Sequence, residues 1–179
     1  MSITLVIGGS RSGKSSRAEA LARDLEGEVV YVATCRTAGL DAEMEARIHR
    51  HREDRPNHWQ TVEDRFDLVD LAVDYAGRVL LLDCLTLWLA HWLEVDGEID
   101  AVLRRLEGGL AAFRESGVTV IIVSNEVGCG IVPLGPETRA YRDLVGWANQ
   151  LVARAADRVE WVVAGIPVEI KAPDRSRPS

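Results

Sequence analysis

The sequence predicts an α/β fold in which a mostly parallel sheet carries helices on both faces and ends in an antiparallel edge hairpin. Three observations predict it. Short apolar runs alternate with helical patterns, a glycine-rich motif follows the first run, and the last two runs almost adjoin. Apolar runs without polar alternation are typical of parallel strands that are covered on both faces. We expect one domain over residues 1–171 and a disordered tail over 172–179, which has two prolines and no apolar periodicity.

The elements are expected in a strand-then-helix order, which favours a parallel sheet. The expected strands are residues 3–7, 28–34, 78–83, 118–124 and 159–165. The expected helices are residues 14–25, 41–54, 66–75, 84–94, 99–116 and 137–156. The run "PVEIK" (167–171) follows the last strand so closely that the two must form a hairpin, with the final strand at an antiparallel edge.

Composition excludes several classes of protein. The formal net charge of −7 over 179 residues argues against a nucleic-acid-binding protein. Three cysteines without metal spacing indicate reduced thiols in a cytoplasmic protein. No apolar stretch approaches the ~20 residues that span a bilayer. The first apolar run lacks a preceding basic segment, so we interpret it as a strand and not as a signal peptide.

A phosphate-binding loop is predicted directly after the first strand. "GGSRSGKS" matches the pattern G-x-x-x-x-G-K-[ST] between a strand and a helix, which assigns the sheet to the P-loop NTPase, RecA-like type. Backbone N–H groups and a helix N-terminus would face phosphate oxygens, Lys14 would reach the β- and γ-phosphates, and Ser15 would bind Mg²⁺. The alternative is a glycine turn that happens to precede a helix. The predicted nucleotide-binding residues of the loop are Gly8, Gly9, Ser10, Arg11, Ser12, Gly13, Lys14 and Ser15.

Two other strand ends carry acids that should meet the same edge of the sheet. Asp83 ends "VLLLD" and is predicted to join the Mg²⁺ shell, although it could also cap the following helix. Glu126, in "VSNEVGCG", could orient a nucleophile or a water, or cap a loop. The chain lacks the [NT]-K-x-D element of regulatory GTPases.

The stretch "RIHRHREDRP" (47–56) places two histidines in opposite electrostatic settings on the helix expected over 41–54. His49 has an acid four residues away on each side, whereas His51 has Arg47 and Arg55 at that spacing. Flanking guanidinium groups disfavour imidazolium, so His51 should stay neutral and nucleophilic, while the same arginines would clamp phosphate. Asp54 could hold the other ring nitrogen. The alternative is a surface histidine in a charged helix.

Two pairs of residues on expected helices give less specific predictions. Trp88 and Trp92 are expected in the core or a subunit interface, and Arg139 and Arg142 on a solvated helix face, with an anionic substrate as the alternative for the arginines.

Taken together, several segments resemble one family over residues 3–171. They are "GGSRSGKS", "YVATCR", "EMEARIHRHREDRPNHWQTVE", "LLLDCLTLWLA", "VSNEVGCGIVP" and "NQLVARAADRVEWVVAGIPVEIK". The family is the bifunctional adenosylcobinamide kinase/adenosylcobinamide-phosphate guanylyltransferases (CobU/CobP type) of cobalamin biosynthesis. The resemblance implies phosphorylation of adenosylcobinamide by ATP or GTP, then transfer of GMP from GTP through an enzyme histidine, in a homotrimer that takes a corrinoid substrate.

The resemblance also implies roles for particular residues. The guanylylated histidine falls on His51, and the nucleotide contacts fall on Ala33, Thr34, Cys35, Arg52, Glu53, Asp54, Arg55, Glu63 and Asp83 in addition to the loop. The chain departs from the pattern at Asp83, where relatives often carry Glu, and at Arg50, where some carry a second histidine. The rival functions are a P-loop small-molecule kinase without a covalent step and a nucleotide-binding regulatory protein.

Overall fold

The computed structural model describes residues 1–36 and 56–172, so the helix expected over 41–54 and most of the expected tail lie outside it. The described strands are β1 (Ile3–Gly8), β2 (Val29–Ala33), β3 (Gln60–Glu63), β4 (Val79–Asp83), β5 (Thr119–Asn125), β6 (Arg158–Val163) and β7 (Ile166–Lys171). The described helices are α1 (Lys14–Arg23), α3 (Leu68–Asp74), α4 (Leu85–Asp96), α5 (Ile99–Ser116) and α6 (Pro136–Ala155), with a short 3₁₀ helix η1 (Val127–Cys129).

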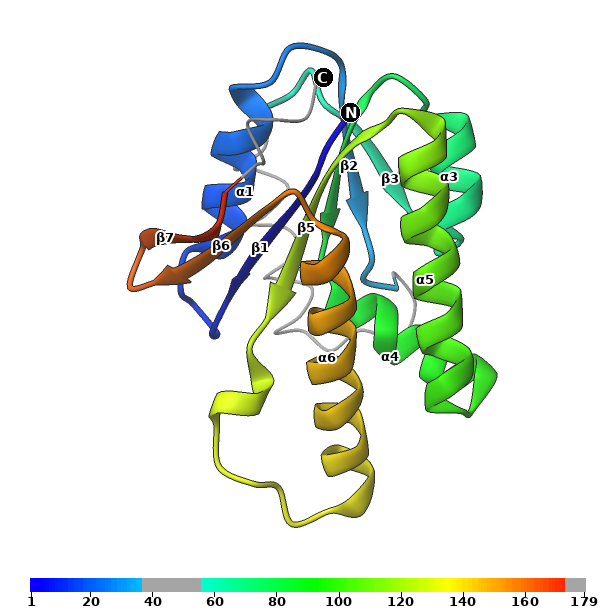
Figure 1. Ribbon diagram of the computed structural model, residues 1–179, viewed down its shortest axis with the longest axis vertical. Helices are drawn as coiled ribbons and strands as arrows, with labels where there is room; N and C mark the ends of the chain where they lie inside the picture. The colour runs from blue at the N-terminus through cyan, green and yellow to red at the C-terminus, as the bar shows by residue number, and fades with distance from the viewer. Residues whose placement is uncertain (37–55, 173–179) are drawn as a thin grey trace.

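The strands form one sheet in the order β3-β2-β4-β5-β1-β6-β7. Six strands are mutually parallel, and β7 pairs antiparallel with β6 at the edge. Figure 1 shows α1 on one side of this sheet and α3, α5 and α6 on the other. The predicted fold class and the antiparallel final strand are therefore confirmed.

Strand β3 was not predicted. It pairs parallel with β2 at the opposite edge from β7. Its sequence, "QTVE", has a single buried apolar residue, Val62. An edge strand with so little buried surface leaves no apolar run in the sequence, so hydrophobic periodicity could not reveal it.

Two apolar layers cover the sheet. Alternate residues of β1 belong to different layers. Ile3 and Leu5 face the larger cluster under α3 to α6, whereas Val6 faces the smaller cluster under α1. The small residues Ala18 and Ala22 let α1 pack closely on its face. None of the described helices is long and apolar enough to cross a membrane.

Trp88 and Trp92 of α4 meet the expectation of a packing role. Trp88 is fully buried in the larger cluster, and Trp92 packs partly buried against it. Both indole N–H groups donate to the carbonyl of Phe66, at 2.7 and 3.3 Å. The pair therefore fixes the chain segment that leads into α3.

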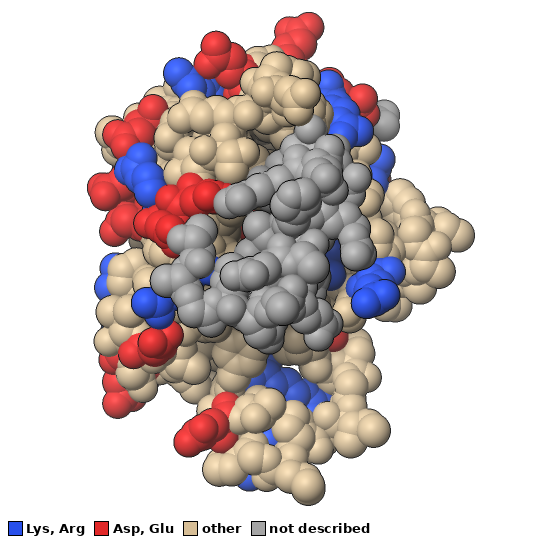
Figure 2. All heavy atoms as spheres, turned by 180° about the vertical axis from the view of Figure 1, so that it is seen from behind, with Lys and Arg blue, Asp and Glu red and all other residues tan. Residues whose placement is uncertain are grey.

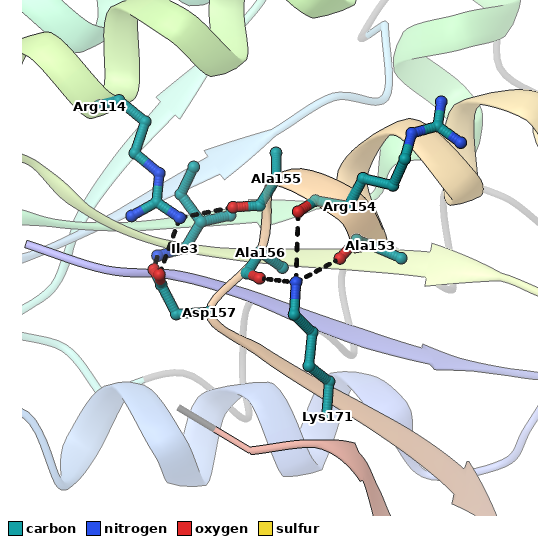
Figure 3. Close-up of polar contacts among 8 residues, drawn as sticks. All are labelled: Ile3, Arg114, Ala153, Arg154, Ala155, Ala156, Asp157 and Lys171. Atoms are coloured by element: carbon teal, nitrogen blue, oxygen red, sulfur yellow. Dashed lines mark hydrogen bonds and ion pairs between the residues drawn. The ribbon is translucent and has the colours of Figure 1, made fainter. Parts of the chain in front are cut away.

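The β6–β7 hairpin turns through two residues with positive φ, Ala164 (51°) and Gly165 (81°). Two such residues make the tight turn whose twist matches that of the strands. Near the base of this hairpin, Lys171 donates its ammonium hydrogens to the carbonyls of Ala153, Arg154 and Ala156 (Figure 3). This cation neutralises the carbonyl end of α6 and ties β7 to it.

Figure 3 also shows how the start of β1 is held. Arg114 of α5 forms an ion pair with Asp157 at 2.8 Å and donates to the carbonyl of Ala155. Asp157 in turn accepts from the backbone N–H of Ile3 at 2.8 Å. One carboxylate thus joins α5, the end of α6 and the first strand.

Charge on the molecular surface is mixed. Figure 2 shows acidic side chains gathered along one side of the rear face, with Lys and Arg interspersed among them. This distribution agrees with the net charge of −7.

One carboxylate is buried within the sheet. Glu160 of β6 is 1 % exposed, and Arg17 of α1 grips it through two hydrogen bonds, at 2.7 and 2.9 Å. Arg158 adds a second ion pair at 2.7 Å. The hydrogen bond from Arg17 lowers the pKa of Glu160, which outweighs the opposite effect of burial.

We predict that Glu160→Gln lowers the free energy of unfolding at pH 7 by about 2–3 kcal/mol, the range for a hydrogen bond to a charged group. Because the folded pKa is depressed, the stabilisation is present above the unfolded value near 4.5 and is lost as the pH falls through the folded value. Urea unfolding of both proteins across this range measures it. Glu169→Gln, which removes the more exposed partner of Arg158, should change stability by less than about 1 kcal/mol. An equal loss at low and neutral pH would contradict the prediction.

Candidate functional site

The carboxyl ends of the parallel strands bring most of the predicted site residues to one edge. Across β3, β2 and β4, the register aligns Glu63, Ala33 and Asp83. Across β5 and β1 it aligns Asn125 with Gly8, where the glycine loop begins. With about 4.8 Å between strands, this row extends roughly 19 Å from β3 to β1. A nucleotide laid along this edge would therefore meet residues from five strands.

The glycine loop depends on Gly8 because no side chain fits there. A Cβ at Gly8 would lie 2.5 Å from both Ser12 Oγ and the carbonyl oxygen of Val162. Gly13 adopts a φ of 91° at the N-cap of α1. The loop is thus wrapped against β6 and turns directly into the helix.

Several features of the loop fit an anion. The N-terminus of α1 has no side-chain cap, and Lys14 is buried at the first helical position, with its ammonium donating to the carbonyl of Gly9 at 3.0 Å. Among the described residues, the buried hydroxyl of Ser12 finds no hydrogen-bond partner. A helix terminus, a lysine and an unpaired hydroxyl in one glycine loop suit phosphate oxygens.

Two backbone hydrogen bonds hold the loop from its two sides. The N–H of Glu126 donates to the carbonyl of Gly8 at 3.2 Å, and the N–H of Gly165 donates to the carbonyl of Ser12 at 2.8 Å. The end of β5 and the turn of the final hairpin therefore fix the loop's shape.

The alternative role of Asp83 as a helix cap is wrong. The N-cap of α4 is Cys84, and it makes no side-chain capping bond. Instead, Asp83 accepts a hydrogen bond from the hydroxyl of Tyr31 at 2.8 Å. Its carboxylate and the hydroxyl of Ser15, in the first turn of α1, are oxygen ligands of the kind that Mg²⁺ prefers.

Thiols near the site are not activated. Burial, and then the neighbouring Asp83, raise the pKa of the Cys84 thiol. A hydrogen bond to Glu126 raises the pKa of Cys129. Both stay protonated at neutral pH, which removes them as nucleophiles.

Glu126 is held by side chains and does not merely cap a loop. Asn149 of α6 donates to its carboxylate at 3.5 Å, and the buried Ser124 donates to Asn149 at 2.6 Å. Glu126 is the N-cap of η1 but makes no capping bond there.

Arg139 is exposed and Arg142 is half-exposed, in line with the expected solvated helix face, but both also bond to the backbone of the preceding loop. Arg139 donates to the carbonyls of Pro133 and Leu134, and Arg142 donates to the carbonyl of Gly128 at 2.7 Å. Both guanidinium groups brace the loop between η1 and α6, and neither is simply solvated.

The remaining predicted residues divide into two groups. Ala33, Thr34 and Cys35 end or follow β2 at the site edge, and Thr34 donates its hydroxyl hydrogen to the carbonyl of Cys84 at 2.7 Å. The residues predicted from the histidine stretch, Arg47, His51, Arg52, Glu53, Asp54 and Arg55, lie outside the described part of the chain.

Sequence reasoning missed three residues that shape this site. They are Tyr31, which holds Asp83, Asn149, which holds Glu126, and Gly165, which holds Ser12. The sequence gives one signal for Tyr31 and Asn149, which is that each is a polar residue within an otherwise apolar pattern. For Gly165, the sequence indicates only a glycine in a turn.

Comparison with known proteins gives concordant matches. Residues 4–170 match the family model for cobinamide kinase / cobinamide phosphate guanyltransferase. The chain is 43% identical to the bifunctional adenosylcobalamin biosynthesis protein CobP of Pseudomonas aeruginosa, with 93% of this chain and 96% of that protein covered. It is 41% identical to the bifunctional adenosylcobalamin biosynthesis protein CobU of Escherichia coli, with 93% and 98% covered.

Solved structures support the fold alone. An ATPase from the type III secretion system of pathogenic bacteria superimposes with a TM-score of 0.56 at 13% identity, covering 94% of this chain and 56% of that one. The P4 protein from bacteriophage phi6, in complex with ADP, gives 0.51 at 13% identity, covering 93% and 52%. The chain therefore spans about half the length of each of these two proteins.

We predict that Gly8→Ala lowers the free energy of unfolding by about 1–3 kcal/mol, the usual cost of overpacking. The added methyl group would collide with Ser12 and with the backbone of Val162. At Gly9, by contrast, nothing lies within 4 Å of a Cβ, so Gly9→Ala should change stability by less than about 0.5 kcal/mol. Urea unfolding of the two variants measures the difference, and equal stabilities would contradict the close packing described at Gly8.

Proposed function

Because the chain belongs to the cobinamide kinase / cobinamide phosphate guanyltransferase family, we propose that it carries out both transfers of that family in cobalamin biosynthesis. The first transfer phosphorylates the aminopropanol hydroxyl of adenosylcobinamide with a nucleoside triphosphate. The second moves GMP from GTP onto the new phosphate and gives adenosylcobinamide-GDP. The corrinoid is thus the acceptor substrate, and GTP and ATP are the nucleotides.

The observation that carries the proposal is the glycine loop with Lys14 at its base. Lys14 is buried beneath a loop whose backbone is fixed from both sides. Phosphoryl transfer needs positioning and charge neutralisation more than it needs covalent chemistry, and this loop supplies both. In our proposal the ammonium of Lys14 shifts from the carbonyl of Gly9 to the phosphate oxygens.

We assign Mg²⁺ to Ser15 and Asp83. The hydroxyl and carboxylate oxygens suit this ion, which usually keeps several waters and takes its other ligands from phosphates. Tyr31 restrains one oxygen of Asp83 and so sets the plane of the carboxylate. Bound there, the ion would neutralise charge on the leaving group. Asp is one methylene shorter than the Glu that the family resemblance leads us to expect, and it keeps the charge.

We further propose that GMP is carried on His51, between the phosphate clamps Arg47 and Arg55. The imidazole nitrogen attacks the α-phosphorus of GTP, a P–N bond forms, and the bond to the bridging oxygen breaks to release pyrophosphate. An oxygen of the corrinoid phosphate then attacks the same phosphorus and displaces His51. The support is the arginine spacing around His51 in the sequence.

We predict that incubation with GTP labelled at the α-phosphate leaves acid-labile label on the protein and that His51→Ala abolishes it. A P–N bond is labile in acid, which a serine or threonine ester is not. His49→Ala is the matched control, because His49 lies between acids. It should retain the label. Label that persists in His51→Ala would reject the assignment, and a wild-type protein that phosphorylates cobinamide without acquiring label would favour a simple kinase.

We also propose that the enzyme is a cytoplasmic homotrimer whose subunits meet on the β6–β7 hairpin. One face of this hairpin carries the exposed residues Trp161, Val163, Ile166, Val168 and Ile170. Trp161 lies opposite Val168, and Val163 lies opposite Ile166, so these side chains share one face. Exposed apolar patches of this kind mark interaction sites. The three free cysteines suit a reducing compartment.

We predict that Val168→Glu converts the trimer to monomers, because a buried unpaired carboxylate would be placed in the contact. Sedimentation equilibrium measures the assembly mass. Val73→Glu is the control, since Val73 is also exposed but lies on α3, away from the hairpin. A wild-type monomer, or a Val168→Glu variant that stays trimeric, would contradict this placement of the contact.

A further inference from the structure

Glu126 occupies a position next to the glycine loop that the two transfers described above leave without a role. It directly follows β5, the strand that lies between β1 with the loop and β4 with Asp83. Its backbone N–H donates to the carbonyl of Gly8, the first residue of the loop, at 3.2 Å. The backbone of Glu126 is therefore anchored within one strand spacing of the phosphate-binding loop.

A buried polar pair sets the orientation of the group that holds this carboxylate. Ser124 is fully buried, and its hydroxyl donates to Asn149 Oδ1 at 2.6 Å. Because this oxygen is engaged, the amide nitrogen of Asn149 must face the other way. That nitrogen donates to the carbonyl of Asn125 at 3.2 Å and to Glu126 Oε1 at 3.5 Å.

The burial of this pair is informative. Asn149 is 7 % exposed and lies among apolar residues of α6, such as Val145, Ala148 and Val152. Burying an amide and a hydroxyl costs free energy that an apolar pair would not. Beyond packing, the amide directs a donor to the carbonyl of Asn125 and, at the longer distance of 3.5 Å, to the carboxylate of Glu126.

The other contacts of Glu126 leave its carboxylate without an ion-pair partner among the described residues. Cys129, protonated, donates to Glu126 Oε2 at 3.4 Å, and a thiol is a weak donor. Arg142 does not pair with the carboxylate in the structure, since its guanidinium donates to the carbonyl of Gly128. Glu126 itself is half-buried at the rim of the site.

We propose that Glu126 is the catalytic base of the kinase step and that Asn149 is the positioning residue that aims it, an inference that rests on the proposed function. The carboxylate accepts the proton of the substrate hydroxyl as the oxygen attacks the γ-phosphorus. The new O–P bond forms, the bond from the γ-phosphorus to its bridging oxygen breaks, and the nucleoside diphosphate leaves with that electron pair.

Only the kinase step needs such a base. Its nucleophile is a hydroxyl group, which must lose a proton. The nucleophiles of GMP transfer are a neutral imidazole nitrogen and a phosphate monoester oxygen that is largely deprotonated at neutral pH, because its second pKa is about 6. Loss of Glu126 should therefore separate the two reactions of one protein.

The test measures both reactions in each variant of the full-length chain. The first assay follows phosphorylation of adenosylcobinamide with saturating ATP and, separately, GTP. The second follows pyrophosphate release from GTP with adenosylcobinamide phosphate supplied. For Glu126→Gln we expect kcat of the first reaction to fall about 10²–10⁴-fold, the usual contribution of general base catalysis, with the nucleotide KM unchanged. The second reaction should fall by less than about threefold.

Asn149→Asp tests the positioning role. It keeps an oxygen for Ser124 and nearly the same shape, but replaces the donor to Glu126 by a second carboxylate. We expect the kinase kcat to fall by up to about 10²-fold with the nucleotide KM unchanged. Two exposed residues give matched controls, Gln150→Glu on α6 and Glu107→Gln on α5, and neither should alter either reaction.

A third variant guards against a purely structural effect. In Glu126→Ala, added formate should restore part of the kinase activity, because it supplies a carboxylate to the space left open, and Glu137→Ala with formate should show no change. Wild-type kinase kcat in Glu126→Gln would overturn the inference, as would equal loss of both reactions or of nucleotide affinity. A wild-type protein inactive in both assays would instead refute the proposed function.

Discussion

The close approach of β6 to the glycine loop is the constraint on which the site depends. The carbonyl oxygen of Val162 lies 2.5 Å from where a Cβ of Gly8 would be, so the loop begins in contact with the neighbouring strand. That contact exists only because β6 pairs in register with β1, with Val162 opposite Gly8. The pairing is fixed in turn by the apolar residues of both faces and by the ion pair of Glu160 with Arg17 on α1. The packing of the core therefore also sets the geometry of the phosphate-binding loop.

The parallel sheet explains why chemistry collects at a single edge. Every strand from β1 to β6 points its carboxyl end the same way, so residues distant in sequence end in one row. Several polar side chains near this row are buried or half-buried and are met by specific partners. Asp83 meets Tyr31, Thr34 meets the backbone after Asp83, and Ser124 meets Asn149. Such satisfied buried groups hold their neighbours in one conformation.

The features of the fold and the site that could be predicted from the sequence were those that depend on short-range sequence patterns. The glycine loop has a spacing tied to its mechanism, Asp83 ends an unbroken apolar run, and the final hairpin follows from two runs with almost nothing between them. The features that could not be predicted depend on contacts between segments that are distant in the sequence. Strand β3 buries too little to leave a pattern, and Asn149 gains its role only when α6 lies against β5. Arg139 and Arg142 look like solvated helix residues until the loop before α6 folds back on them. His51, predicted from the arginine spacing and from the family resemblance, lies outside the described residues.

The turn of the last hairpin has a consequence for the synthesis of the protein. Gly165 donates to the carbonyl of Ser12, although some 150 residues of chain separate the two along the sequence. The phosphate-binding backbone is therefore completed by residues that are synthesised about 150 positions after the loop itself. A nascent chain that has already formed β1 to β5 still lacks the strand and the turn that support its nucleotide site. Synthesis of the loop sequence alone therefore does not complete the support of the loop, which comes only from β6 and the turn that follows it.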